Sequence, residues 1–166
     1  MKNFYTALMT YFNALSGGSH NAFYTDIGGR LYNTYAPEGA TLPYAVFQHI
    51  SSRPADTFTE TMDEILLQFS IFSASPSSSE VLTAMDDLKS LFDNCAFAVE
   101  EATIVRFSRG GEGLTSEIYE TVDGLQRGWH YYVEYEVLLQ AIDILVLESG
   151  AALLTESGDR IVGEWM

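Results

Sequence analysis

The sequence has 166 residues, 47% hydrophobic and 13% aromatic, a size and composition that favour one folded domain and argue against intrinsic disorder. Lys and Arg number 8 against 23 Asp and Glu, a net charge of −15, so tight binding to nucleic acid is not expected. A single cysteine, Cys95, excludes an internal disulfide, and we interpret it as a small buried apolar residue.

No export signal or membrane span is expected from the sequence. The first residues mix apolar and polar side chains, which is not typical of a secretory signal. No apolar run reaches the roughly 18 residues that a membrane helix needs. We therefore expect the protein to be made in the cytoplasm.

The first quarter of the chain predicts one helix followed by irregular structure. Residues 3–15 repeat apolar side chains at helical spacing, and the Ser-Gly-Gly-Ser sequence at 16–19 is expected to end the helix. Residues 20–43 contain paired glycines and two prolines, which interrupt any long element.

Two strands and a helix are predicted in the middle of the chain. Residues 44–50 and 64–72 are rich in β-branched and aromatic residues, and we expect them to pair antiparallel across a polar loop, 51–63. Ser77 and Glu80 have the spacing of a capping box, which predicts the start of a helix with an apolar stripe that ends near Phe92.

Two further strands are predicted after this helix. Residues 97–107 form the third, and residues 129–140 form the fourth, with strict alternation of apolar and polar side chains. Between them, residues 108–128 are polar and contain glycine, which predicts a long loop. We interpret both long loops, 51–63 and 108–128, as arms that contact partners and become ordered on assembly.

The predicted fold class is α+β, a single domain over residues 1–141. Its sheet is expected to be antiparallel and four-stranded, or mixed, with helices packed on one face. Residues 142–166 repeat short apolar runs and Glu-Ser-Gly turns every eight residues, and we interpret them as a short-strand extension packed on the domain or on a neighbouring copy.

The sequence contains no recognisable catalytic or cofactor motif. The three histidines lack zinc-site spacing, and no nucleophile elbow is present, so we expect no catalytic residue, metal or cofactor. Adjacent carboxylates at Asp63-Glu64, Asp86-Asp87 and Glu100-Glu101 leave a metal-dependent hydrolase open as an alternative, although neighbours on a strand point to opposite faces.

Aromatic and charged side chains near the two long loops are the candidate contacts with partner proteins, because Trp, Tyr and Arg are enriched at interface hot spots. For Trp129 and Tyr131, packing in the core is an equally good interpretation. The candidates are Arg53, Asp56, Glu112, Glu117, Tyr119, Arg127, Trp129 and Tyr131.

The order of elements and one stretch of sequence resemble the tail terminator, or tail completion, proteins of long-tailed phages. The resemblance covers residues 3–140 and is carried by Gly-Arg-Leu-Tyr at 29–32, Ala-Pro-Glu-Gly-Ala at 36–40, Leu-Pro-Tyr-Ala-Val-Phe at 42–47 and the segment 51–57. These are residues that determine a fold and not residues that catalyse a reaction. The repeat after residue 141 departs from the family pattern.

The resemblance implies a structural virion protein and no enzyme. Such proteins form a ring, commonly a hexamer, on the last ring of the tail tube protein, end tail growth and join the tail to the head connector while DNA passes through the lumen. The implied partners are other copies of the chain, the major tail tube protein and the connector or stopper protein, in a particle assembled in the host cytoplasm. Two alternatives stay open beside the hydrolase: a head–tail stopper and a monomeric binding domain outside the virion.

Overall fold

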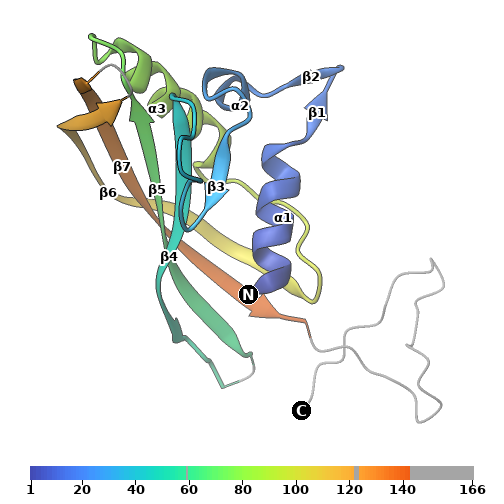
Figure 1. The fold of residues 1–166 in the computed structure, drawn as a ribbon. Coiled ribbons are helices and arrows are strands. Elements are labelled where there is room, and N and C mark those ends of the chain that lie inside the picture. The colour runs from blue at the N-terminus through green and yellow to red at the C-terminus, as the bar shows by residue number, and fades with distance from the viewer. Residues whose placement is uncertain (59, 122–123, 143–166) are drawn as a thin grey trace.

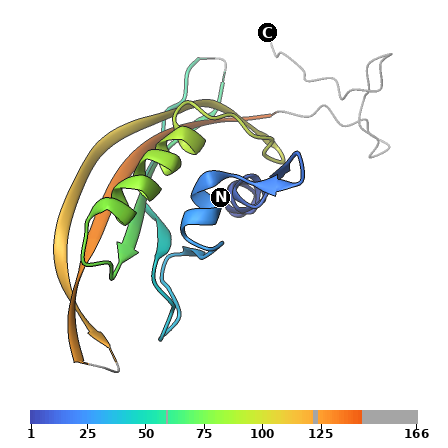
Figure 2. The same ribbon diagram turned by 90° about the horizontal axis from the view of Figure 1, so that it is seen from above.

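The computed structural model describes residues 1–58, 60–121 and 124–142. It has one mixed sheet of five strands with three helices packed on one face, as Figures 1 and 2 show. The predicted α+β single-domain fold is therefore confirmed, with a fifth, short strand added to the sheet. No helix among the described residues is long and apolar enough to span a membrane. The predicted C-terminal repeat at 145–164 lies outside the described residues.

The sheet has the strand order β3-β4-β5-β7-β6. Only β3 and β4 are parallel, and every other neighbouring pair is antiparallel, including the predicted pair β4 and β5. The strands are β3 (Leu31–Asn33), β4 (Tyr44–Pro54), β5 (Met62–Ser73), β6 (Ala102–Thr121) and β7 (Gly124–Ala141). Figure 2 shows that the sheet curves around the helices, which lie on its concave side.

The core lies between the concave face of the sheet and the three helices α1 (Lys2–Phe12), α2 (Ala22–Asp26) and α3 (Ser79–Phe92). Alternate residues of β5 and β7 point into it, as the period-2 pattern predicted. Phe92 lies at the centre, with its ring centroid 4.8 Å from that of Phe69 and 6.0 Å from that of Phe107. The hydroxyl of Tyr135 donates to the Asp93 carboxylate at 2.8 Å, so this buried tyrosine has a partner for its polar group.

The first helix is shorter than predicted, and a short hairpin and the capping residue Asn21 connect it to α2. The helix ends at Phe12, and residues 15–20 form a two-stranded hairpin, β1 (Leu15–Ser16) and β2 (Ser19–His20). Its turn places Gly17 and Gly18 at φ of 62° and 85°, a conformation that favours glycine. Asn21 accepts from the Tyr24 amide at 2.8 Å and donates to the Phe12 carbonyl at 2.7 Å, which fixes the start of α2 against the end of α1.

The helix α3 begins near the predicted residue, but Ser77 and Glu80 do not form the predicted capping box. The N-cap is Ser78, and its side chain makes no capping hydrogen bond. The Glu80 carboxylate accepts a hydrogen bond from Ser73 at the end of β5, and the Ser77 hydroxyl accepts from the Ser79 amide at 3.2 Å. The tertiary contact with Ser73 therefore replaces the local contact that sequence spacing indicated.

The largest correction concerns the predicted loop at 108–128, because its described residues, 108–121 and 124–128, belong to the strands β6 and β7. The third strand begins at residue 102 and not at 97, and it continues with two bulges to Thr121, paired with β7 along its length. The loop prediction rested on the glycines, which are weak strand formers. At Gly113, however, an added Cβ would lie 2.7 Å from Cε1 of Tyr132, its cross-strand partner. Glycine is present there because the Tyr132 ring covers the position.

Candidate partner interface

The strands β6 and β7 extend beyond the rest of the sheet as a two-stranded arm. The pairing of β5 with β7 ends at Ser73 and Trp129, whereas β6 and β7 continue to pair through residues 117–121 and 124–128. Figure 1 shows this arm at the end of the sheet near α3. Within the part of the chain that the structure describes, β6 pairs with β7 alone, so its outer edge presents backbone groups that another chain can pair with.

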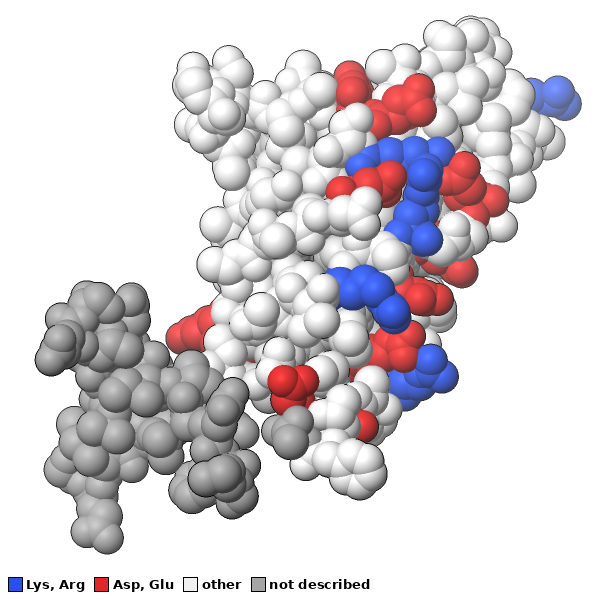
Figure 3. Space-filling view, turned by 180° about the vertical axis from the view of Figure 1, so that it is seen from behind, with Lys and Arg blue, Asp and Glu red and all other residues white. Residues whose placement is uncertain are grey.

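An ionic row crosses the convex face of the sheet, opposite the helices. Arg53 on β4 contacts Glu64 on β5 at 2.8 Å, and Arg106 on β6 contacts Glu64 at 3.4 Å and Glu136 at 3.6 Å. The row follows the strand register, since Arg53 lies opposite Glu64, and Glu64 and Arg106 both lie opposite Leu138. In Figure 3 the basic side chains of this face lie among acidic ones, so it presents no continuous positive patch.

A second charged cluster joins α3 to the concave side of the hairpin that β6 and β7 form. Glu112 on β6 accepts from Lys89 on α3 at 3.0 Å, from Arg109 at 3.3 Å and from the Tyr131 hydroxyl at 2.9 Å. The hydrogen bond from Lys89, followed by that from Tyr131 and the charges of Lys89 and Arg109, lowers the pKa of Glu112. Burial, together with the bond to Glu112, raises the pKa of Tyr131. This cluster holds the hairpin against the helix layer.

His130 and Glu117 meet at the base of the arm on the convex face. The Nδ1 of His130 lies 2.8 Å from the Glu117 carboxylate, and the imidazole stacks on Phe72 with ring centroids 4.4 Å apart. The other ring nitrogen, Nε2, is buried and has no hydrogen-bond partner among the described residues. Glu117, one of the predicted contact residues, therefore also orients a histidine of the neighbouring strand.

The connection between β4 and β5 is a shorter arm than predicted. Residues 51–54 and 62–63 belong to the strands, so the loop covers only 55–61. Asp56 accepts from the Met62 amide at 3.1 Å, and the Thr57 amide donates to the Glu60 carbonyl at 2.9 Å, so the loop has internal hydrogen bonds. Phe58 is fully exposed at its tip, with a relative exposure of 110%. A partner that covers Phe58 would remove a large apolar surface from water.

The structure brings the predicted interface residues into three places and leaves one in the core. Arg53 and Asp56 lie at the β4–β5 end, Glu112 in the cluster with Lys89, and Glu117 with the exposed Arg127 on the arm. Trp129 is half-buried against the core. Tyr131 is 2% exposed and therefore packs in the core, which was the alternative interpretation of this residue. Tyr119 lies in the arm, on β6.

Sequence reasoning missed the three most exposed large apolar side chains of the described residues. Phe58, Ile118 on the arm, and Tyr35 in the connection before β4 are 110%, 67% and 76% exposed. Phe58 carried a usable signal, because a lone phenylalanine in a polar segment has no predicted core to enter. Ile118 carried none, since the segment around it was predicted to be a loop.

The carboxylate pairs do not form a metal site within the described residues. Glu64 is engaged by two arginines, and Asp63 next to it on β5 lies on the other side of the strand. Across the described part of the chain, no group of three or more His, Cys, Asp and Glu side chains is placed to hold a metal ion. The geometry therefore gives the hydrolase alternative no support.

Comparisons with known proteins indicate the same family as the sequence resemblance. The family "Tail completion protein gp17" matches residues 19–137. No curated protein matches the chain in sequence. The fold is similar to that of a chain in the virion of a native gene transfer agent (GTA) particle, with a TM-score of 0.58 and 9% identity over 82% of this chain and 93% of that chain. A second solved structure, 14% identical, covers 82% of this chain and 91% of its own at a TM-score of 0.41, too low to compare folds.

The match to the family covers every strand of the five-stranded sheet, apart from the last four residues of β7, together with α2 and α3. The convex face, the hairpin arm and the β4–β5 loop all lie within the matched residues. The chain therefore belongs to the tail completion protein gp17 family and is a structural protein of the virion tail.

Proposed function

We propose that the chain caps the tail tube as a ring of identical subunits, six in number, ends tail growth and joins the tail to the head connector. In this role the protein is not an enzyme, its partners are the major tail tube protein and the connector, and DNA passes through the ring without specific binding. The observation that carries the proposal is the family match over residues 19–137, which includes the sheet and both of its projecting ends.

The open edge of β6 supports a ring built from identical contacts. Ring closure requires each subunit to present two different surfaces, one on each side, so that subunits join head to tail. This chain has two different sheet edges: β6 at one side, and β3 with the unpaired continuation of β4 at the other. An interface between these edges has the asymmetry that a closed ring needs.

The charge distribution supports passage of DNA without retention. Affinity for DNA increases with the number of cationic side chains that are free to neutralise phosphates. On the convex face, Arg53 and Arg106 already contact the acidic side chains of Glu64 and Glu136. The net charge of −15 further opposes retention of phosphates.

Negative-stain electron microscopy and native mass spectrometry test the proposal, on the protein alone and mixed with purified tail tubes. We expect rings, or caps at one end of each tube. The variant Ile118→Asp on the arm is expected to abolish caps, whereas Thr83→Asp, on the exposed face of α3, is the matched control and keeps them. A monomer that ignores tail tubes yet binds the connector would contradict the proposal and favour a head–tail stopper.

A further inference from the structure

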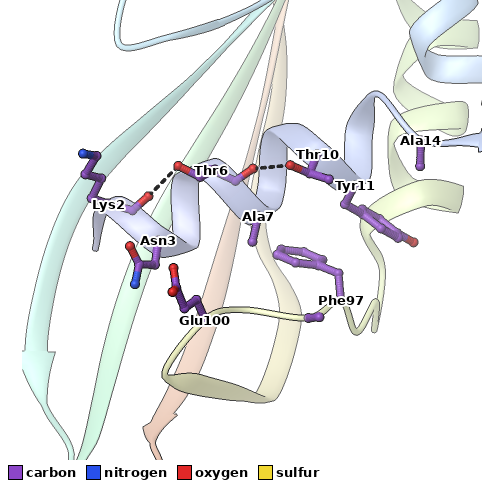
Figure 4. A pocket seen from close by; sticks show the side chains of 10 residues that line it. Lys2, Asn3, Thr6, Ala7, Thr10, Tyr11, Ala14, Phe97 and Glu100 are labelled. Carbon is purple, nitrogen blue, oxygen red and sulfur yellow. Dashed lines mark hydrogen bonds between the residues drawn. The ribbon is translucent and has the colours of Figure 1, made fainter.

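A groove runs along the exposed side of α1, outside the interface described above. Its volume is about 630 Å³, and it lies between α1 and residues 97–100, the segment that precedes β6. Figure 4 shows the side chains of Thr6, Ala7 and Thr10 along the helix, with Phe97 facing them from the other wall. The rings of Tyr11 and Phe97 stack at 5.0 Å and form the floor at one end.

The groove is nearly uncharged and offers few free hydrogen-bonding groups. The hydroxyls of Thr6 and Thr10 donate to carbonyl oxygens of their own helix, at 3.1 and 2.8 Å, and the Tyr11 hydroxyl donates to the Leu91 carbonyl at 3.1 Å. Lys2 is the one charged residue of α1. A helix face that meets water usually carries charged side chains, and this chain has 31 of them, so the uncharged face of α1 indicates a surface that is covered.

The chain itself passes the end of this groove where the described residues end. The Ile142 amide donates to the Glu101 carbonyl at 3.1 Å, and the Asn3 side chain donates to the Glu101 carboxylate at 3.5 Å. Glu100, the neighbour of Glu101, lines the groove. The residues that follow are Asp143, the apolar run Ile-Leu-Val-Leu at 144–147, and Glu148. An uncharged run thus begins two residues after the contact with Glu101, beside a groove whose charged lining residues are Lys2 and Glu100.

The lengths agree as well. Along Lys2–Phe12 the groove is about 15 Å long, at about 1.5 Å per helical residue. Residues 143–148 would span about 20 Å if extended, at about 3.3 Å per residue, and the run 144–147 about 13 Å. The segment is therefore long enough to reach along the groove of its own chain with no connecting segment. Because a tethered segment has a high effective concentration, this contact is favoured over one with another copy.

We propose that residues 143–148 occupy the α1 groove of the same chain, with the run 144–147 covering Ala7 and Phe97. Neither α1 nor this run belongs to the family match, which spans residues 19–137. The contact is independent of ring formation.

Engineered disulfides test the contact directly. In a Cys95→Ser background, Ala7→Cys is combined with either Leu145→Cys or Val146→Cys, because neighbours in an extended segment point to opposite sides. The matched control replaces Ala7→Cys with Thr83→Cys on the exposed face of α3. We expect one of the two pairs to oxidise at least tenfold faster than the control, with the mass of a monomer and at a rate independent of protein concentration.

Other outcomes are equally informative. Rates equal to the control would overturn the proposal, and covalent dimers alone would show that the run binds a neighbouring copy. Hydrogen exchange gives a second measurement that needs no cysteine: deletion of residues 143–166 should speed exchange of the α1 amides at least fivefold and leave α3 unchanged. Both experiments use monomers at low concentration, so a failure of ring formation does not affect them.

Discussion

Replacement of Asp26 by asparagine is expected to stabilise the protein at neutral pH and to have no effect in acid. Asp26 is the last residue of α2 and packs against α3, where its Oδ2 is buried and has no hydrogen-bond partner among the described residues. Burial, followed by the interactions with the neighbouring carboxyl groups of Asp87 and Glu80, raises the pKa of Asp26 to about 6. The folded state therefore favours the protonated, neutral form of this side chain.

The sign and size follow from the difference in pKa between the folded and unfolded states. A rise in the pKa from the ordinary 3.8 to about 6 corresponds to a loss of at most about 3 kcal/mol in the free energy of unfolding, at about 1.36 kcal/mol per pKa unit. Because the side chain is only partly buried, we discount this to about 1–2 kcal/mol. Well below pH 3.8 both states are protonated and nothing is lost. Between pH 3.8 and about 6 the unfolded state ionises first and the stability falls, and the loss is complete once the pH has risen through the folded pKa of about 6.

Thermal unfolding at pH 3 and pH 7.5 measures the effect. We expect the unfolding midpoint of Asp26→Asn to exceed that of the wild type by about 2–8 °C at pH 7.5 and to match it at about pH 3. Asp86→Asn, on the exposed side of α3, removes the same charge from the chain and is expected to give no pH-dependent difference. Equal midpoints for Asp26→Asn and wild type at pH 7.5, or an equal gain from Asp86→Asn, would refute the reasoning.

Three further variants test the packing of the hairpin and the ionic row. Gly113→Ala should cost about 1 kcal/mol in urea unfolding, because its Cβ would meet the Tyr132 ring at 2.7 Å, and the cost should disappear in a Tyr132→Ala background. Tyr135→Phe should cost about 1–3 kcal/mol, since it removes the buried hydrogen bond to Asp93; an unchanged midpoint would show that this bond contributes nothing. Arg53→Ala should change stability by less than about 1 kcal/mol, as expected for an exposed ion pair, so a loss of tail caps at unchanged stability would place Arg53 at the interface.

Local sequence patterns predicted the parts of the fold that local physics controls. Alternation along 64–72 and 129–140 indicated the two central strands and the faces that they bury, because the period of side chains on a strand is fixed at two. The helical stripe that ends at Phe92 likewise indicated the inner face of α3. The stretch that carried the family resemblance, residues 29–57, lies entirely inside the family match.

Tertiary contacts decided what those patterns could not. Residues 108–121 and 124–128 contain polar residues and glycines with weak preference for strands, and only the pairing of β6 with β7 makes them strands and an arm. The Glu80 carboxylate accepts a hydrogen bond from Ser73, seven residues earlier in the chain, and therefore does not cap the helix. The candidate interface was predicted as residues on two loops and at the start of the fourth strand. The placement of these residues at the ends and on the convex face of one sheet follows from strand register, which a sequence without its fold does not specify.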